Sequence, residues 1–348
     1  MVDVFGISVA LLALFVVFGL MIGVLFGFFG MGGSFLVTPV LLVMGYEPTV
    51  AVGSGLAFVF GTSVIATLKH RDLGQVDYKL GVSMIIGTTI GLEIGKELVV
   101  GLQAQGSADA LISVIYVVLL GGIGAFFTYQ ELTGNDDTDG GVSHDADGDV
   151  EADADDIPDI AKKIQSYHIP PMLNLRGGVQ VSLWVILAVA FVTGLLSGFL
   201  GVGGGFIRMP ALFYIIGVPV PIAVGTDLFE IVFSGGIGTY LYASTGGVKL
   251  DIVVPLLAGS ALGARLGSAA TSIVHESEIK IYFGLMLLGG AVAVAFRQLS
   301  GYLGMEVLNT ASFALIILSA LLVSGAVVYS SIKNLREEEA GPTVSSSD

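Results

Sequence analysis

The sequence lacks cysteine and contains few charged residues. Without thiols the chain forms no disulfide, thiolate nucleophile or thiolate metal site. Charged residues make up only 12% of its 348 residues, against about a quarter in globular domains, while 54% are hydrophobic. A water-soluble fold cannot bury that much apolar surface. The sequence therefore predicts an integral membrane protein.

The alternation of apolar and polar residues that marks a transmembrane β-barrel is also missing. Long apolar runs stand in its place, and a helix needs about 20 apolar residues to span the hydrocarbon core. Two further runs, 34–44 and 205–216, are about half that length. We predict an all-α, multi-pass protein of the cell membrane with 10 or 11 transmembrane segments, of which the long ones lie near 7–29, 50–69, 79–101, 109–130, 181–200, 222–244, 250–273, 279–297 and 307–330.

Glycine is abundant, at 50 residues, and its placement repeats along the chain. Segment 23–41 (GVLFGFFGMGGSFLVTPVL) matches segment 194–212 (GLLSGFLGVGGGFIRMPAL) at ten positions. After one inserted residue the match continues, so that 51–95 corresponds to 223–267. A duplication of this kind, about 75 residues long, indicates two homologous membrane repeats.

Loop charge predicts how the two repeats face. If both short segments cross the membrane and the N-terminus lies outside, nine Lys and Arg residues are cytoplasmic and three are external. If the short segments re-enter, the division is eight to four, so the positive-inside rule favours the first arrangement, in which the repeats are inverted. We divide the chain into a first repeat (1–130), a cytoplasmic loop (131–180), a second repeat (181–300) and an additional helix with a polar tail (301–348).

The loop holds much of the chain's negative charge. Twelve of the 29 acidic residues lie between Glu131 and Asp159, a composition that favours an unordered, solvated segment and a halophilic source. A calcium loop beginning at Asp145 would need glycine at Val150 and glutamate at Asp156, so we expect no calcium site. The four histidines have no metal-ligand spacing. We predict no cofactor, no metal and no nucleic-acid partner.

The two glycine clusters are candidate anion sites. Each precedes a short apolar segment, whose first N–H groups lack intrahelical partners and whose positive helix end attracts an anion. Close helix packing is the alternative role of these glycines, but duplication of the whole pattern favours binding. The predicted anion-binding residues are Gly30, Gly32, Gly33, Ser34, Gly201, Gly203, Gly204 and Gly205, with added hydroxyls from Ser54 and Thr226 at helix starts.

The paired G-x-G-G-[GS]-F-x-x-x-P loops and the A-V-G-[ST] turns at Gly53 and Gly225 resemble those of the sulfite exporter TauE/SafE family, over about residues 7–297. The resemblance implies a permease for sulfite, sulfonates or related organosulfur anions. The chain departs from the common pattern in its acidic central loop, its added last helix and its Met31-Gly32-Gly33-Ser34 sequence.

Charged residues within apolar segments are costly and usually face a partner or a cavity. Arg208 lies in the second short segment and is a candidate to hold an oxyanion with its planar guanidinium. Asp227 and Glu230 share one face of the following helix and are candidates to carry a coupling proton or sodium ion. The alternative is that Arg208 pairs with Asp227 or Glu230 and only locks helices together.

These patterns favour a small-anion transporter over two other functions. A passive channel needs the same anion site, but inverted repeats are typical of transporters. An intramembrane hydrolase is disfavoured, because Asp227 is the only aspartate well inside a predicted span and no histidine lies at a helix centre.

Overall fold

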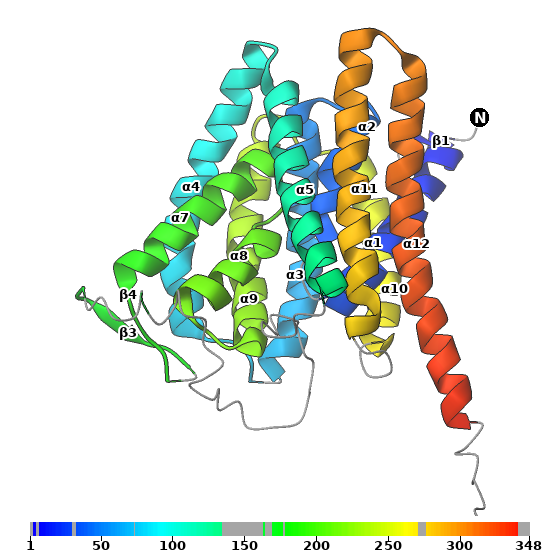
Figure 1. Ribbon diagram of the computed structural model, residues 1–348. Coiled ribbons are helices and arrows are strands. Elements are labelled where there is room, and N and C mark those ends of the chain that lie inside the picture. The colour runs from blue at the N-terminus through cyan, green and yellow to red at the C-terminus, as the bar shows by residue number, and fades with distance from the viewer. Residues whose placement is uncertain are drawn as a thin grey trace, which may run out of the picture.

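The computed structural model describes residues 3–4, 7–29, 33–72, 74–133, 163, 169–176, 178–270 and 276–339. These residues are almost entirely helical (Figure 1). Among them, eight helices are long and apolar enough to cross a membrane. The predicted all-α polytopic fold is confirmed.

The elements follow the predicted segments closely. The first half contains β1 (Asp3–Val4), β2 (Ile7–Ser8), α1 (Val9–Phe29), η1 (Gly33–Leu36), α2 (Val37–Val43), α3 (Pro48–Asp72), α4 (Tyr78–Ala104) and α5 (Ala108–Thr133). The second half contains β3 (Met172–Asn174), β4 (Gln180–Ser182), α7 (Leu183–Leu200), α8 (Gly205–Ala211), the π-helical turn η2 (Leu212–Ile216), α9 (Val220–Ala243), α10 (Leu250–Ala270), α11 (Glu276–Leu303) and α12 (Glu306–Glu339).

Helix α4 differs from the other long helices. It has 27 residues, but it carries Glu93, Lys96 and Glu97 and is not among the eight helices with a membrane-spanning composition. One face of α4 packs closely against α7 and α9. Its length and packing place it within the bundle despite these charges.

An ordered hairpin lies in the segment that we predicted to be a largely unordered loop. Strands β3 and β4 pair antiparallel, with Met172 opposite Ser182. The backbone N–H of Arg176 donates to Asp77 Oδ2 at 2.6 Å, which fixes the hairpin to the turn between α3 and α4. The acidic residues 134–162 lie outside the described residues.

Equivalent helices of the two halves pair reciprocally. Helix α1 packs on α10, and its counterpart α7 packs on α4, which is the counterpart of α10. At the centre α3 packs on α9, and α5 packs on α11. In Figure 1 the α4–α7 pair lies at the left of the bundle and the α1–α10 pair at the right.

Glycine makes the two outer pairs possible. A Cβ atom added at Gly91 would overlap the carbonyl oxygen of Phe191, and one at Gly263 would overlap that of Leu20. These two glycines are equivalent in the duplicated sequence. The repeated glycine spacing therefore produces the same close backbone contact, a small-residue helix interface, in both halves.

The order of contacts along each pair gives the helix directions. Gly19 and Gly27 of α1 meet Leu256 and Ala264 of α10, so that α1 and α10 run parallel. By contrast, Gly238 of α9 meets Leu56 of α3, and Gly235 meets Phe60. The equivalent helices α3 and α9 are therefore antiparallel.

Candidate functional site

The second glycine cluster forms a tight, buried turn between α7 and α8. Gly201, Gly203 and Gly204 have φ values of 77°, 70° and 90°, in the left-handed region that favours glycine. A side chain at Gly203 would overlap Val59, which lies near the middle of α3. The turn therefore reaches the central level of the bundle.

Two tyrosines hold the C-terminal end of α7, just before this turn. The Tyr242 hydroxyl of α9 donates to the carbonyl oxygen of Gly198 at 2.5 Å, and the Tyr116 hydroxyl of α5 donates to that of Leu200 at 2.6 Å. Both carbonyls lie in the last turn of α7, where intrahelical partners run out. No sequence pattern indicates these contacts, because they join helices that are far apart in the chain.

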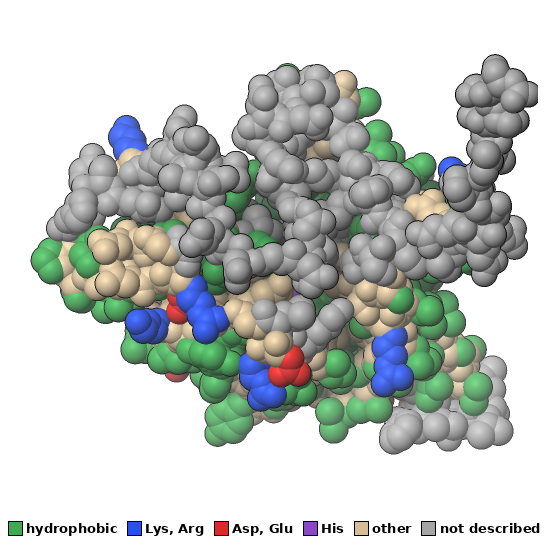
Figure 2. Space-filling view, turned by 90° about the horizontal axis from the view of Figure 1, so that it is seen from below, with side chains coloured by type: hydrophobic (Ala, Val, Ile, Leu, Met, Phe, Trp, Pro, Cys, Tyr) green, Lys and Arg blue, Asp and Glu red, His purple; other side chains and the backbone are tan. Residues whose placement is uncertain are grey.

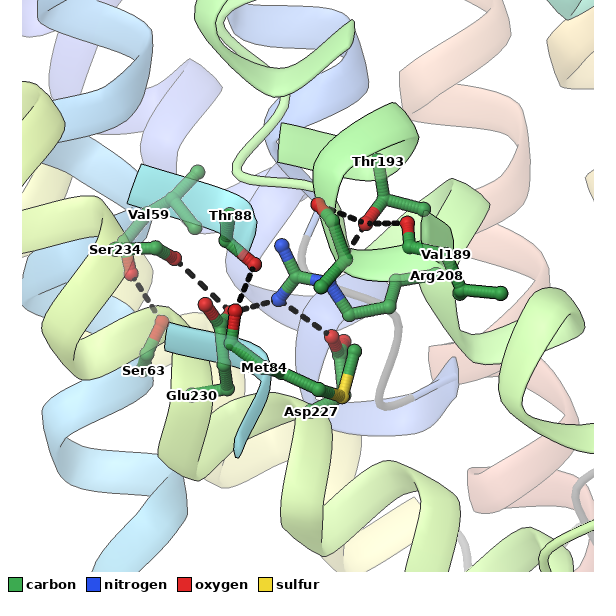
Figure 3. Close-up of polar contacts among 11 residues, drawn as sticks. Val59, Ser63, Met84, Thr88, Val189, Thr193, Arg208, Asp227, Glu230 and Ser234 are labelled. Carbon is green, nitrogen blue, oxygen red and sulfur yellow. Dashed lines mark hydrogen bonds and ion pairs between the residues drawn. The ribbon is translucent and has the colours of Figure 1, made fainter. Parts of the chain in front are cut away.

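Arg208, on α8, is completely buried and pairs with both acidic residues of α9 (Figure 3). Its Nη1 lies 3.1 Å from Asp227 Oδ1 and also donates to Glu230 Oε2. Its Nε donates to Thr193 Oγ1 on α7 at 3.3 Å. The structure therefore joins three of the predicted residues in one charged cluster, in the pairing that the sequence left as an alternative to anion binding.

Thr193 and Ser234 add hydroxyl groups to this cluster, and neither was predicted from the sequence. Besides Thr193, Ser234 donates to Glu230 Oε2 at 3.0 Å from one turn further along α9. Thr193 was detectable in principle, because it and Ser197 are the only hydroxyl residues in the apolar α7.

The cluster is nevertheless not saturated. Nη2 of Arg208 and Oε1 of Glu230 are buried and have no hydrogen-bond partner among the described residues. Nη2 faces the glycine turn, since a Cβ at Gly204 would lie 2.5 Å from it, and a Cβ at Gly205 would lie 2.7 Å from Asp227 Oδ2. Because Gly204 and Gly205 have no side chains, the Arg208 guanidinium and the Asp227 carboxylate lie directly against the backbone there. Buried polar atoms without partners are rare in native proteins and call for a specific explanation.

The sequence predicted that Ser54 and Thr226 lie at helix starts, but neither residue begins its helix. Helix α3 starts at Pro48 and α9 at Val220, because proline is well suited to the first turn of a helix. Both hydroxyl oxygens instead accept backbone N–H groups from the opposite half: Ser54 from Lys249 at 3.2 Å, and Thr226 from Asp77 at 2.9 Å. Each hydroxyl keeps its own proton to donate.

The first glycine cluster is described only in part. Gly33 and Ser34 form the first turn of η1, whereas Gly30 and Gly32 lie outside the described residues. Arg208 corresponds to Val37, so the charged cluster belongs to one half only. No group of three metal-ligating side chains occurs in the described part of the chain.

The fold and this cluster define a multi-pass helical membrane protein with a buried charged site at the break between two helices. Residues 15–295 match the model of the sulfite exporter TauE/SafE family, and the chain belongs to that family. It is a membrane transporter, the class that the fold, the family and its relatives share.

Its relatives carry general transport names. A probable membrane transporter protein of Xylella fastidiosa is 26% identical over 80% of this chain and 93% of its own length. The probable membrane transporter protein YunE of Bacillus subtilis is 25% identical over 78% of this chain and 93% of its own length. No solved structure gives a significant match.

Proposed function

We propose that the protein transports a small anion, namely sulfite, a sulfonate or a related organosulfur anion, and binds it between the two glycine loops beside Arg208. One observation carries this proposal: a guanidinium nitrogen of Arg208 is buried, lacks a partner in the described structure and faces the backbone of Gly204. A planar guanidinium and backbone N–H groups are suitable donors for an oxyanion. Ser54 and Thr226 stay candidates for further hydroxyl contacts.

The level of the cluster supports this location. Glu230 lies close to the middle of α9, and Gly203 lies against the middle of α3. Transporters built from repeats bind their substrates near the bilayer midplane, at the repeat interface and beside interrupted helices. The break between α7 and α8 is such an interruption.

Helix direction supports inverted repeats. If the short segments η1–α2 and α8–η2 cross the membrane, α3 and α9 must point in opposite directions, as their contacts require. If these segments re-entered instead, α3 and α9 would be parallel. The favoured topology therefore has eleven crossings, with the acidic loop and the C-terminus in the cytoplasm.

Surface charge is consistent with this orientation. Figure 2 views the end of the bundle where α3 meets α4, and Lys and Arg side chains lie across it. Arg71 and Arg176 are exposed in this region. The positive-inside rule assigns such a face to the cytoplasm.

A passive channel is the second candidate. An open pore would need a hydrated path past the charged cluster, but Arg208 and Glu230 have no exposed surface. Complete burial favours an occluded state, which alternating access requires and a simple pore does not. An aspartyl hydrolase is not supported, because Arg208 lies between the two acidic side chains.

Flux measurements in proteoliposomes test the proposal. Sulfite, thiosulfate, sulfate and methanesulfonate would be supplied separately to the purified protein. We expect saturable uptake of at least one sulfur anion, and Arg208→Met should abolish it. Arg265→Met is the matched control, because Arg265 is exposed on α10, and it should retain flux. Absence of uptake of all four anions, or equal uptake by both variants, would contradict the proposal.

A further inference from the structure

Among the described residues, no other charged side chain forms an ion pair with Arg208, Asp227 or Glu230. Arg208 is the only charged residue of α8, Asp227 and Glu230 are the only ones of α9, and α7 has none. The cluster meets Thr88 of α4 and lies near Ser63 of α3, both uncharged (Figure 3). The charged residues of α3 and α4 lie elsewhere. Those of α3 lie at its C-terminal end, at Lys69, His70, Arg71 and Asp72. Those of α4 lie away from this contact, at Lys79, Glu93, Lys96 and Glu97.

The net charge of Arg208, Asp227 and Glu230 limits the protonation states that this cluster can adopt. Ionisation of both carboxylates gives a net charge of −1, and addition of a monovalent anion would make it −2. Uncompensated buried charge is expensive in a low-dielectric interior, so that near-neutral states are favoured. Neutrality is reached with one ionised carboxylate when the site is empty, and with none when Arg208 holds an anion.

Glu230 has a place for the additional proton. Its Oε2 is occupied by Arg208 and Ser234, whereas its Oε1 has no hydrogen-bond donor among the described residues. Thr88 lies beside this carboxyl, but its hydroxyl proton is directed to the carbonyl oxygen of Met84 at 3.0 Å. With its proton on Met84, Thr88 can accept a hydrogen bond from a protonated Glu230.

We propose that each monovalent anion bound at Arg208 replaces one carboxylate charge, that the Asp227–Glu230 pair takes up one proton in the same step, at Glu230 in the parent protein, and that transport is therefore electroneutral co-transport of one anion with one proton. This inference rests on the proposed function and specifies its coupling ion. The proton comes from water on the side where the anion enters and leaves with the anion on the other side, so that charge balances in every loaded state.

The experiment uses the full-length protein in liposomes with pyranine, a pH indicator, in the lumen. Methanesulfonate is the first probe, because its charge does not change with pH, and sulfite is the second. We expect anion entry to acidify the lumen with one proton for each anion. A pH gradient of one unit should give about tenfold accumulation. A potassium diffusion potential of 100 mV should have no effect, whereas it would change the distribution of an uncoupled monoanion about 50-fold.

Three results would overturn the inference while leaving the proposed function intact. These are anion flux without lumen acidification, flux that follows the membrane potential, and flux that requires sodium at constant pH. Failure of both probes to enter under every gradient would instead contradict the proposed function itself.

Variants give an independent test. Glu230→Gln and Asp227→Asn each leave one titratable carboxyl, so each should retain one proton per anion if it transports. The double variant leaves Arg208 without a carboxylate and should bind anion with no proton uptake and no pH dependence. Proton uptake by purified protein on anion addition measures this without transport. Retention of one proton by a folded double variant would place the proton site elsewhere.

Discussion

The hydroxyl of Thr226 accepts a hydrogen bond of 2.9 Å from the backbone N–H of Asp77, across the boundary between the two halves. The same contact occurs with the two halves exchanged, at positions 172 residues away. Ser54 is the counterpart of Thr226, and it accepts a hydrogen bond from the backbone N–H of Lys249, the counterpart of Asp77. Each hydroxyl ties the early part of a central helix to the loop before a helix of the other repeat. Both contacts are made in the same structure, one at each end of the bundle.

Removal of the Thr226 hydroxyl should weaken the contact between halves. Thr226→Val keeps the shape but leaves the buried N–H of Asp77 unpaired, and we expect a loss of about 1–3 kcal/mol in stability. Thr226→Ser, which keeps the acceptor, is the matched control and should lose much less. Thermal unfolding in detergent measures the difference. If Thr226→Val unfolds like the parent protein, the hydrogen bond does not contribute to stability; if its anion affinity is also unchanged, Thr226 has no role in the anion site.

Cysteine labelling tests the orientation of the repeats. Asp72 and Ser244 are exposed, equivalent positions next to the α3–α4 and α9–α10 turns. In a chain without native cysteine, Asp72→Cys should resist an impermeant thiol reagent in intact cells, and Ser244→Cys should react. Labelling of both after membrane permeabilisation controls for accessibility. The reverse pattern would invert the proposed topology, and equal reactivity would contradict inverted repeats.

The sequence predicted the helices well because their determinants are local. Apolar length and glycine spacing can be read directly from the sequence. The repeat relates Gly91 to Gly263, and the structure shows that both lie at close helix contacts. Arg208, Asp227 and Glu230 also stood out, because charge within an apolar run is visible without a structure.

The missed residues depend on tertiary contacts. Thr193 and Tyr116 are ordinary polar or aromatic residues until α7 and α5 bring them to Arg208 and to the end of α7. The hairpin β3–β4 was missed for a similar reason: its short strands are fixed by the α3–α4 turn through Asp77 rather than by a strong local pattern.

Close packing at glycine should be measurable by substitution. Gly91→Ala places a methyl group against the backbone of α7, and overpacking of this kind costs about 1–3 kcal/mol. Gly122, within α5, has nothing within 4 Å of an added Cβ, so that Gly122→Ala should be neutral or stabilising by up to about 1 kcal/mol through helix propensity. Melting temperatures of the two purified variants give the comparison. Equal stability of both would show that α4 and α7 are not in close backbone contact.

The glycine turn itself gives the most direct test of the anion site. Gly204 has φ = 90°, and a Cβ there would lie 2.5 Å from Arg208 Nη2, so Gly204→Ala strains the backbone and displaces the guanidinium. Gly246→Ala is the matched control, because Gly246 has φ = 75° but nothing within 4 Å of an added Cβ. We expect both variants to lose about 1–2 kcal/mol of stability from the left-handed backbone.

Only Gly204→Ala should also lose anion affinity, by about tenfold or more, which corresponds to at least about 1.4 kcal/mol. Arg208→Lys should weaken binding in the same way, since an ammonium keeps the charge but lacks the planar fork of the guanidinium. Gly33→Ala applies the same test to the first glycine loop. Binding of radiolabelled anion to purified, folded protein separates affinity from insertion. Parental affinity in Gly204→Ala and Arg208→Lys would place the anion away from the turn and leave Arg208 as a structural partner of Asp227 and Glu230.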